Sequence, residues 1–162
     1  MNPDDLLVVA DSLAAGEGPG RPRQIELRRA VSTTYYALFH TLANNCADLL
    51  VGPRSPNQTN QAWRQAYRAL DHGEVKRKCT RGPGKPILDA HFPRSIRDFA
   101  RQFVKMQKIR HKADYDPLKP FTRSVVLQFI EETKAAIEDF ENVPSRDRQA
   151  FAVFVLFKLR RD

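Results

Sequence analysis

The chain has 162 residues, with 41% hydrophobic and 28% charged residues, the usual balance of one globular domain with one hydrophobic core. No apolar run approaches the roughly 20 residues that cross a bilayer, and the opening "MNPDDLLVVADSL" is acidic, unlike a secretory signal. Lys and Arg exceed Asp and Glu by 27 − 19 = 8 charges, which favours a polyanionic partner such as RNA. We therefore expect one cytoplasmic domain spanning residues 1–162 without a membrane anchor.

Apolar periodicity predicts helices throughout and no strand. A first helix is expected over residues 3–16, because Pro3 and two aspartates suit a helix N-terminus and "GEGPG" at 16–20 ends it. A second, long helix is expected from about residue 22 to residue 50. Its apolar residues recur at steps of three, four and seven: Leu27, Val31, Tyr35, Leu38, Leu42 and Leu49.

The next segments are a loop, a short helix and a second loop. After the loop at 52–60, Asn57 or Thr59 is expected to cap a third helix. That helix carries Trp63, Ala66, Tyr67 and Leu70 on one face. The stretch "HGEVKRKCTRGPGKPIL" at 72–88 is basic and rich in Gly and Pro, so it is predicted to be a long, partly irregular loop with one helical turn around 74–80.

Three further helices complete the expected fold. The fourth begins near Pro93 and ends at or before Asp116, because Pro117 disfavours helical geometry in the preceding residue. The fifth runs from about residue 122 to residue 142, and Pro144 opens a sixth that reaches the C-terminus. The predicted architecture is an all-α, up-and-down bundle of about five to six antiparallel helices.

The second helix carries a strip of polar side chains beside its apolar stripe. These residues recur at steps of three and four: Arg29, Ser32, Thr33, Tyr36 and His40. Near the end of the fourth helix, "KIRHKADYDP" places Arg110 and Asp114 one turn apart, where an ion pair orients the guanidinium. Both patterns also have plain explanations, as a solvated helix face and as a helix stop before proline.

These motifs resemble the HEPN superfamily, small helical domains named for higher eukaryotes and prokaryotes nucleotide-binding. The resemblance rests on "RRAVSTTYYALFH", "RHKADYD" and the closing "VPSRDRQAFAVFVLFKLR", and it covers about residues 4–160. It implies an antiparallel four- to five-helix bundle that usually dimerises. Many members are metal-independent ribonucleases in toxin systems, phage defence or RNA processing. Others are non-catalytic and bind nucleotides or a minimal nucleotidyltransferase.

The chain departs from the ribonuclease motif of that family, an Arg followed after four to six residues by a His. Arg110 matches the arginine, but the spacing leads to Tyr115, Asp116 and Pro117, and His111 is adjacent to Arg110. The sequence is instead similar to the branch with the pattern Arg-x-x-x-Asp-Tyr. His40 is the candidate replacement, because an imidazole titrates near neutral pH, although it also suits a packed, hydrogen-bonded position.

Two functions follow as expectations: a toxin-like or defence-associated metal-independent endoribonuclease, or a non-catalytic module that binds a nucleotide, RNA, an antitoxin or a nucleotidyltransferase. The expected catalytic residues are Arg110, His40, Asp114 and Tyr115. The expected RNA- or nucleotide-binding residues are Arg29, Ser32, Tyr36, His111, Lys112, Lys76, Arg77 and Lys78. Cys46 and Cys79 lie far apart among scattered histidines, so we expect reduced thiols, no metal site and no other cofactor.

The sixth helix carries a further expectation, about assembly. It is apolar nearly all round: Phe151, Val153, Phe154, Val155, Leu156, Phe157 and Leu159. A helix packed on one side of a small bundle needs an apolar stripe of only about 100°. The excess apolar surface needs a cover, from the first helix or from another chain. Together with the family resemblance, it favours a homodimer with basic surface lining the groove.

Overall fold

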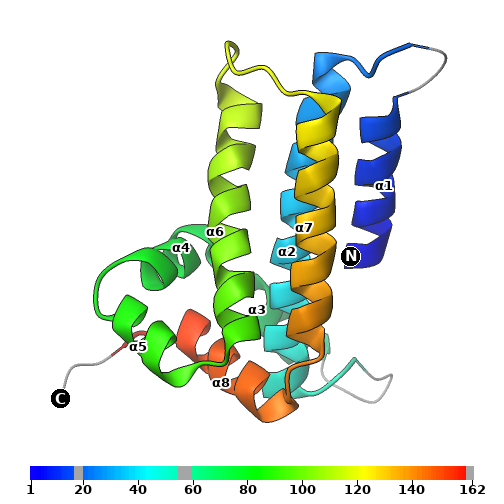
Figure 1. Cartoon of the computed structure of the whole chain (residues 1–162). Helices are drawn as coiled ribbons and strands as arrows, with labels where there is room; N and C mark the ends of the chain where they lie inside the picture. The colour runs from blue at the N-terminus through cyan, green and yellow to red at the C-terminus, as the bar shows by residue number, and fades with distance from the viewer. Residues whose placement is uncertain (17–19, 55–59, 160–162) are drawn as a thin grey trace. The chain divides into compact units, whose positions relative to one another are not determined.

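The structure is a computed structural model that describes residues 1–16, 20–54 and 60–159. All regular secondary structure in those ranges is helical, which confirms the all-α fold (Figure 1). The helices are α1 (Pro3–Ala15), α2 (Gln24–Val51), α3 (Asn60–Arg68), α4 (His72–Thr80), α5 (Gly84–His91), α6 (Arg94–Tyr115), α7 (Arg123–Glu141) and α8 (Ser145–Leu156). None of the described helices has the length and hydropathy of a membrane span.

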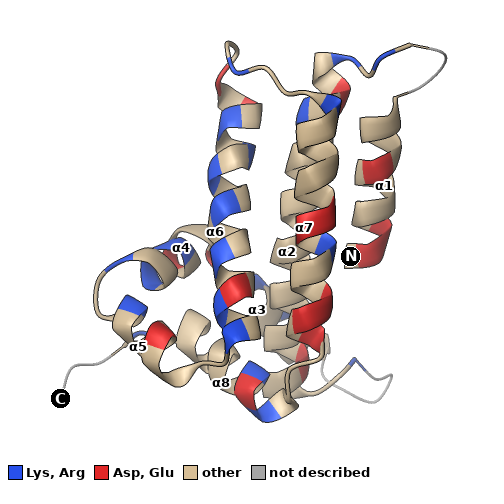
Figure 2. Ribbon diagram, viewed as in Figure 1, with Lys and Arg blue, Asp and Glu red and all other residues tan. Residues whose placement is uncertain are grey.

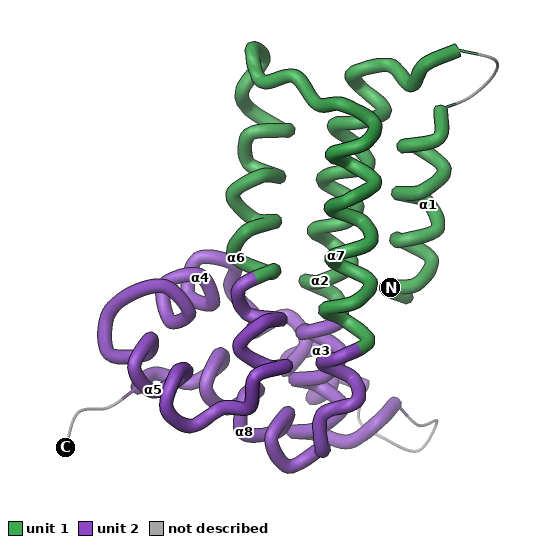
Figure 3. Tube along the Cα trace, in the orientation of Figure 1, with its two compact units in different colours: residues 1–40, 102–138 green, residues 41–101, 139–162 purple. Residues whose placement is uncertain are grey.

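The chain divides into two compact units (Figure 3). Unit 1 comprises residues 1–40 and 102–138, and unit 2 comprises residues 41–101 and 139–162. The boundary falls within α2, α6 and α7, and each unit has its own buried residues.

Unit 1 is a bundle of long helices in which α1 and α2, and likewise α6 and α7, run antiparallel (Figure 1). Tyr35 lies at its centre, fully buried, with its ring 5.4 Å from that of Phe103. The Gln24 amide fastens the start of α7 to α2, because it donates to the Phe121 carbonyl at 2.7 Å and accepts from the Phe121 amide at 3.0 Å. α6 ends at Tyr115, as the following proline predicts.

Unit 2 is built around aromatic side chains. Phe99 stacks on Phe140 with ring centroids 4.2 Å apart, and Phe151 contacts Phe140 at 6.1 Å. On α3, Trp63 stacks on Tyr67 at 5.0 Å and donates from its indole nitrogen to Asp48 at 2.7 Å. The candidate caps of that helix, Asn57 and Thr59, lie outside the described residues.

The prediction of a long irregular loop at residues 72–88 is wrong, because two helices, α4 and α5, occupy this stretch. Asp71 caps α4 by accepting a hydrogen bond from the Glu74 amide at 2.8 Å. Val75 and Cys79, one turn apart, are buried, and so is Leu88 on α5. Only these three apolar side chains among the 17 residues are buried. They are enough to hold two short helices because the rest of unit 2 supplies the core against which they pack. Local composition does not reveal that core.

The sixth expected helix, α8, ends at Leu156 and does not reach the C-terminus. Its broad apolar surface is covered within unit 2: the ring of Phe92, which follows α5, lies 5.6 Å from Phe151 and 5.4 Å from Phe154. Only Val153 and Phe157 are strongly exposed among the large apolar residues of this helix and its C-cap. Most of the apolar surface that suggested a partner chain is therefore covered within unit 2, and only Val153 and Phe157 remain for such a contact.

Candidate functional site

Unit 1 contains an open groove with a cavity volume of about 990 Å³. Residues from α1, α2, the end of α6 and the turn after it line the groove. Its polar lining comes from the strip on α2 and from the end of α6: Arg28, Arg29, Ser32, Thr33, Tyr36 and Asp114. Its apolar lining is Val9, Leu13, Ile25, Ala113, Tyr115 and Pro117. The two motifs that the sequence singled out therefore meet in one place.

The ion pair expected between Arg110 and Asp114 is present. Nε of Arg110 lies 2.6 Å from Oδ2 of Asp114, and the two side chains are 23% and 25% exposed. Nε is buried without the alignment of a hydrogen bond, so the contact is chiefly electrostatic. The guanidinium also lies over two aromatic rings, 5.8 Å from the Tyr35 centroid and 5.5 Å from the Tyr36 centroid. Its direction is therefore fixed by a carboxylate and two rings.

Asp114 joins α6 to the polar strip of α2. Its Oδ1 accepts a hydrogen bond of 2.5 Å from the Ser32 hydroxyl, while Oδ2 faces Arg110. Both carboxylate oxygens thus have a partner inside the protein. Asp114 acts here as a link that holds Ser32 and Arg110 in place.

The neighbouring arginines at the start of α2 have different roles. Arg28 donates to the carbonyls of Ala113, Asp116, Pro117 and Lys119 at 2.8, 2.9, 3.2 and 2.8 Å, and its guanidinium lies 5.9 Å from the Phe121 ring centroid. It therefore satisfies the open carbonyls at the C-terminus of α6 and fixes the turn beyond it. Arg29 is exposed and lines the groove.

Sequence reasoning missed the role of Arg28. Arg28 lies one turn before both Val31, on the apolar stripe, and Ser32, on the polar strip. This spacing places it on the helix face between the two, which was the signal available in the sequence.

His40 joins this cluster through Tyr36. The two rings stack with centroids 6.2 Å apart and an interplanar angle of 28°. His40 is half-buried, and the residues that line the groove do not include it or Arg110. The cluster thus brings together the four residues expected to share a site: Tyr36 and Asp114 line the groove, and Arg110 and His40 contact them without lining it.

At the end of α6, His111 and Tyr115 form an aromatic pair with centroids 4.9 Å apart. Tyr115 is 66% exposed and lines the groove, and His111 and Lys112 are exposed beside it. All three are accessible to a ligand that enters from solvent.

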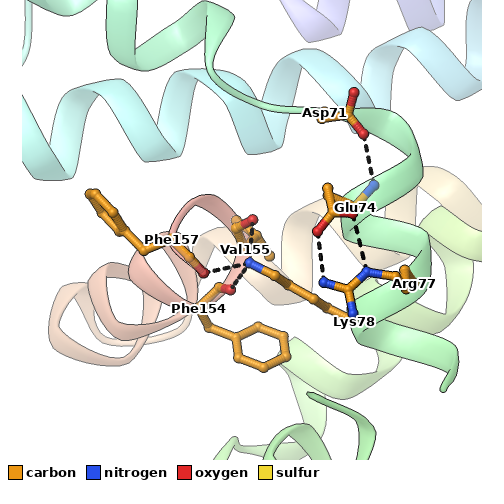
Figure 4. Close-up of polar contacts among 7 residues, drawn as sticks. All are labelled: Asp71, Glu74, Arg77, Lys78, Phe154, Val155 and Phe157. Atoms are coloured by element: carbon orange, nitrogen blue, oxygen red, sulfur yellow. Dashed lines mark hydrogen bonds and ion pairs between the residues drawn. The ribbon is translucent and has the colours of Figure 1, made fainter. Parts of the chain in front are cut away.

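The expected RNA contact of Lys78 is wrong, because this side chain is 2% exposed. Its ammonium donates to the carbonyls of Phe154, Val155 and Phe157 at 2.9, 3.1 and 2.6 Å, where α8 ends (Figure 4). Burial lowers the pKa of Lys78. Beside it, Arg77 pairs with Glu74 at 2.7 Å, and Lys76 is half-buried. These three residues belong to helix α4 of unit 2 instead of to an irregular basic loop.

Neither a metal cluster nor a reactive thiol appears among the described residues. No three His, Cys, Asp or Glu side chains gather there as metal ligands would. Cys46 and Cys79 are buried, and desolvation raises the pKa of each thiol to about 12.

Comparison with protein-family models, with curated proteins and with solved structures gave no significant match to this chain. The candidate site is therefore defined by its own geometry: an arginine held by a carboxylate and two tyrosine rings, next to a groove that Arg29, Tyr36 and Tyr115 line.

Proposed function

We propose that the groove of unit 1 is an RNA-directed site of the HEPN type, and that the protein is a toxin-like or defence-associated metal-independent endoribonuclease. The observation that carries the proposal is the Arg110–Asp114 pair set against Tyr36, beside an open groove with a second, exposed arginine. Arginine suits phosphate because its planar guanidinium donates two parallel hydrogen bonds. Tyrosine rings offer flat surfaces on which single-stranded bases stack.

The proposed reaction is a transfer within the RNA strand. His40 and Arg110 do not line the groove, so the reaction requires Tyr36, which contacts both, to move and open a path to them. His40 then takes the proton from a 2′-hydroxyl, the 2′-oxygen attacks the adjacent phosphorus, and the bond from phosphorus to the 5′-oxygen breaks. Tyr36, whose ring stacks on His40 and which lines the groove, gives its proton to the leaving 5′-oxygen, and His40 returns a proton to Tyr36. Arg29 and Arg110 offset the charge on the phosphate oxygens. The products are a 2′,3′-cyclic phosphate and a 5′-hydroxyl.

A second candidate is a non-catalytic module that binds RNA, a nucleotide or a protein partner such as an antitoxin or a nucleotidyltransferase. Two observations favour it. The family's motif histidine is missing after Arg110, and Asp114 already offsets the charge of that arginine at 2.6 Å. In this case the same groove holds the ligand and no bond is broken.

Purified protein incubated with a mixed RNA pool separates the two candidates. The ribonuclease proposal expects RNA fragments with 2′,3′-cyclic ends, and it expects Arg110→Ala to reduce the cleavage rate by about 100- to 1000-fold because the transition state loses a cation. His40→Gln should reduce the rate as strongly. Arg146→Ala on α8, an exposed arginine, is the matched control and should cleave at the wild-type rate. RNA binding without cleavage under all conditions, with or without a partner protein, would favour the binding module.

A further inference from the structure

One exposed face of the C-terminal part of α6 alternates basic and aromatic side chains. Lys108, His111, Lys112 and Tyr115 follow at positions i, i+3, i+4 and i+7, so they lie side by side along the helix. We call these four residues the α6 strip. All four are exposed, and all four belong to unit 1 (Figure 3). Figure 2 shows Lys and Arg, in blue, on this part of α6.

The opposite face of the same segment is held inside unit 1. Phe103 and Met106 are fully buried, and Ala113, two turns after Met106, is buried as well. Asp114 accepts the hydrogen bond of Ser32 from α2. Because this face is fixed against the rest of unit 1, the α6 strip is directed to solvent.

The fold makes little use of the two lysines of the strip. Among the described residues no carboxylate pairs with Lys108 or Lys112, and the ion pairs of this segment use Lys105 and Arg110 instead. Two lysines four residues apart repel each other, whereas a solvated helix face is stabilised by opposite charges at that spacing. Cations without acidic partners, set between exposed aromatic rings, are typical of surfaces that bind single-stranded nucleic acid.

The two aromatic members form a pair that ends at the groove. The rings of His111 and Tyr115 have centroids 4.9 Å apart and an interplanar angle of 50°. Tyr115 is 66% exposed and lines the groove together with Arg29 and Tyr36. The strip from Lys108 to Tyr115 spans about 10 Å at a rise of about 1.5 Å per residue, the length of about three stacked nucleotides at roughly 3.4 Å each. A strand that lies on the strip therefore reaches the groove within a few nucleotides.

We propose that the α6 strip binds the single-stranded segment of RNA next to the groove, with one base stacked on the His111–Tyr115 pair. Lys108 and Lys112 contact the phosphates on either side of that base. A protein ring stacks only on a base whose face is free, and in a duplex the neighbouring base pairs cover both faces. The strip therefore selects single-stranded over double-stranded RNA. The inference rests on the RNA-directed function proposed above, and it names the form of RNA and the residues that position it.

The first test removes the stacking ring and measures RNA binding by fluorescence anisotropy. The probe is a 5′-labelled, 20-nucleotide 2′-O-methyl RNA, alone or annealed to its complement, which lacks the nucleophilic hydroxyl and so reports binding without cleavage. Tyr115→Ala should weaken binding of the single strand by about 5- to 150-fold and leave binding of the duplex unchanged. Tyr115→Phe, which restores the ring, should recover most of that loss. Leu118→Ala is the control, because Leu118 is 88% exposed and lies outside the groove lining.

The second test removes the two lysines and measures the dependence of binding on salt. Each lost phosphate contact lowers the slope of log K against log salt by about 0.7, so replacement of Lys108 and Lys112 by Gln should lower it by about 1.4. The control variant replaces Lys119 and Arg123 by Gln, which removes the same charge from exposed positions of unit 1 outside the groove lining, and should keep the wild-type slope. If the test variant loses its helical circular dichroism signal, Lys108→Gln alone is measured, with an expected slope change of about 0.7.

Failure of the strip and failure of the proposed function give different results. Equal slopes in the two charge variants, or wild-type affinity of Tyr115→Ala for the single strand, would show that RNA binds elsewhere, and the strip would fail while the RNA-directed function stands. Equal affinity of the wild-type protein for the single strand and the duplex would also overturn the selection of single strands. No binding of either probe by the wild-type protein at any salt would sink the proposed function together with the strip.

Discussion

At the scale of single residues, neighbouring side chains of the same charge have opposite roles. The Arg28 side chain donates hydrogen bonds to four backbone carbonyls, whereas Arg29 next to it is exposed in the groove. Arg77 pairs with Glu74 near the surface, whereas the ammonium of Lys78 is buried at the end of α8. Residue type alone therefore does not separate a cation that binds a ligand from one that holds the fold.

Replacement of Lys78 tests the buried contact directly. Lys78→Met keeps the unbranched stem but leaves the carbonyls of Phe154, Val155 and Phe157 without their donor. We expect the free energy of unfolding to fall by about 1–3 kcal/mol, measured by urea denaturation. Lys76→Met on the same helix is the control and should change it by less than about 0.5 kcal/mol. A Lys78→Met protein more stable than the wild type would mean that desolvation of the ammonium outweighs its hydrogen bonds.

The two thiols predict a dependence on pH. Burial raises the pKa of Cys46 and Cys79 from 9.0 to about 12, so their contribution to stability is complete below pH 9 and is lost as the pH rises toward 12. At pH 8 the thiolate fraction in the folded protein should be on the order of 1000-fold below that of the unfolded chain. A chromogenic disulfide reagent should therefore react with two thiols in urea and very slowly without it. Rapid reaction of either thiol in the native protein would contradict the burial.

At the scale of elements, α4 and α5 show how short helices replace an expected loop. The turn between them is tight: a Cβ atom on Gly84 would lie 2.8 Å from the carbonyl oxygen of Lys78 and 3.0 Å from its Cα. Real side chains do not approach backbone this closely. The glycine that made the stretch look irregular is thus the residue that lets α5 pack against α4.

Gly84→Ala should lower the free energy of unfolding by about 1–3 kcal/mol, because the methyl group must displace backbone. Gly20→Ala is the matched control, since a Cβ there would meet no atom within 4 Å. It should leave stability unchanged or slightly raised, because alanine reduces the freedom of the unfolded chain. Chemical denaturation of both proteins gives the comparison, and equal stability of the two variants would refute the close packing of α4 and α5.

At the scale of the whole molecule, the homodimer remains a prediction from the family resemblance. The apolar surface of α8 gives it little support, because most of that surface is covered within unit 2. Exposed apolar side chains also occur in unit 1, where Val9, Ile25 and Tyr115 line the groove at 48%, 55% and 66% exposure.

Light scattering at micromolar concentration should give a mass near twice the 18.6 kDa of one chain. Ile25→Asp should shift that mass toward one chain, since a charge at the edge of the groove opposes burial against a second copy. Glu138→Gln, an exposed change elsewhere in unit 1, should leave the dimer intact. A wild-type mass near 18.6 kDa would show that the exposed apolar residues do not serve a second copy.

Features that depend on local spacing can be predicted from the amino-acid sequence. The apolar steps of α2 predict a long helix, the proline after Asp116 predicts the end of α6, and the one-turn spacing of Arg110 and Asp114 predicts an ion pair. All three are present. Each is a relation between residues a few positions apart, so backbone geometry fixes it before any long-range packing.

Long-range packing sets which polar groups are buried and what they contact, and this is visible only in the folded chain. Lys78 binds carbonyls 76 to 79 positions away, Ser32 binds Asp114 across 82 positions, and Arg28 reaches carbonyls 85 to 91 positions away. No local pattern encodes such pairs. A basic residue that caps a distant helix and a basic residue that binds a phosphate can have the same neighbours at the same spacing in the sequence. Burial distinguishes them, since an ammonium removed from water must find its hydrogen-bond partners within the protein.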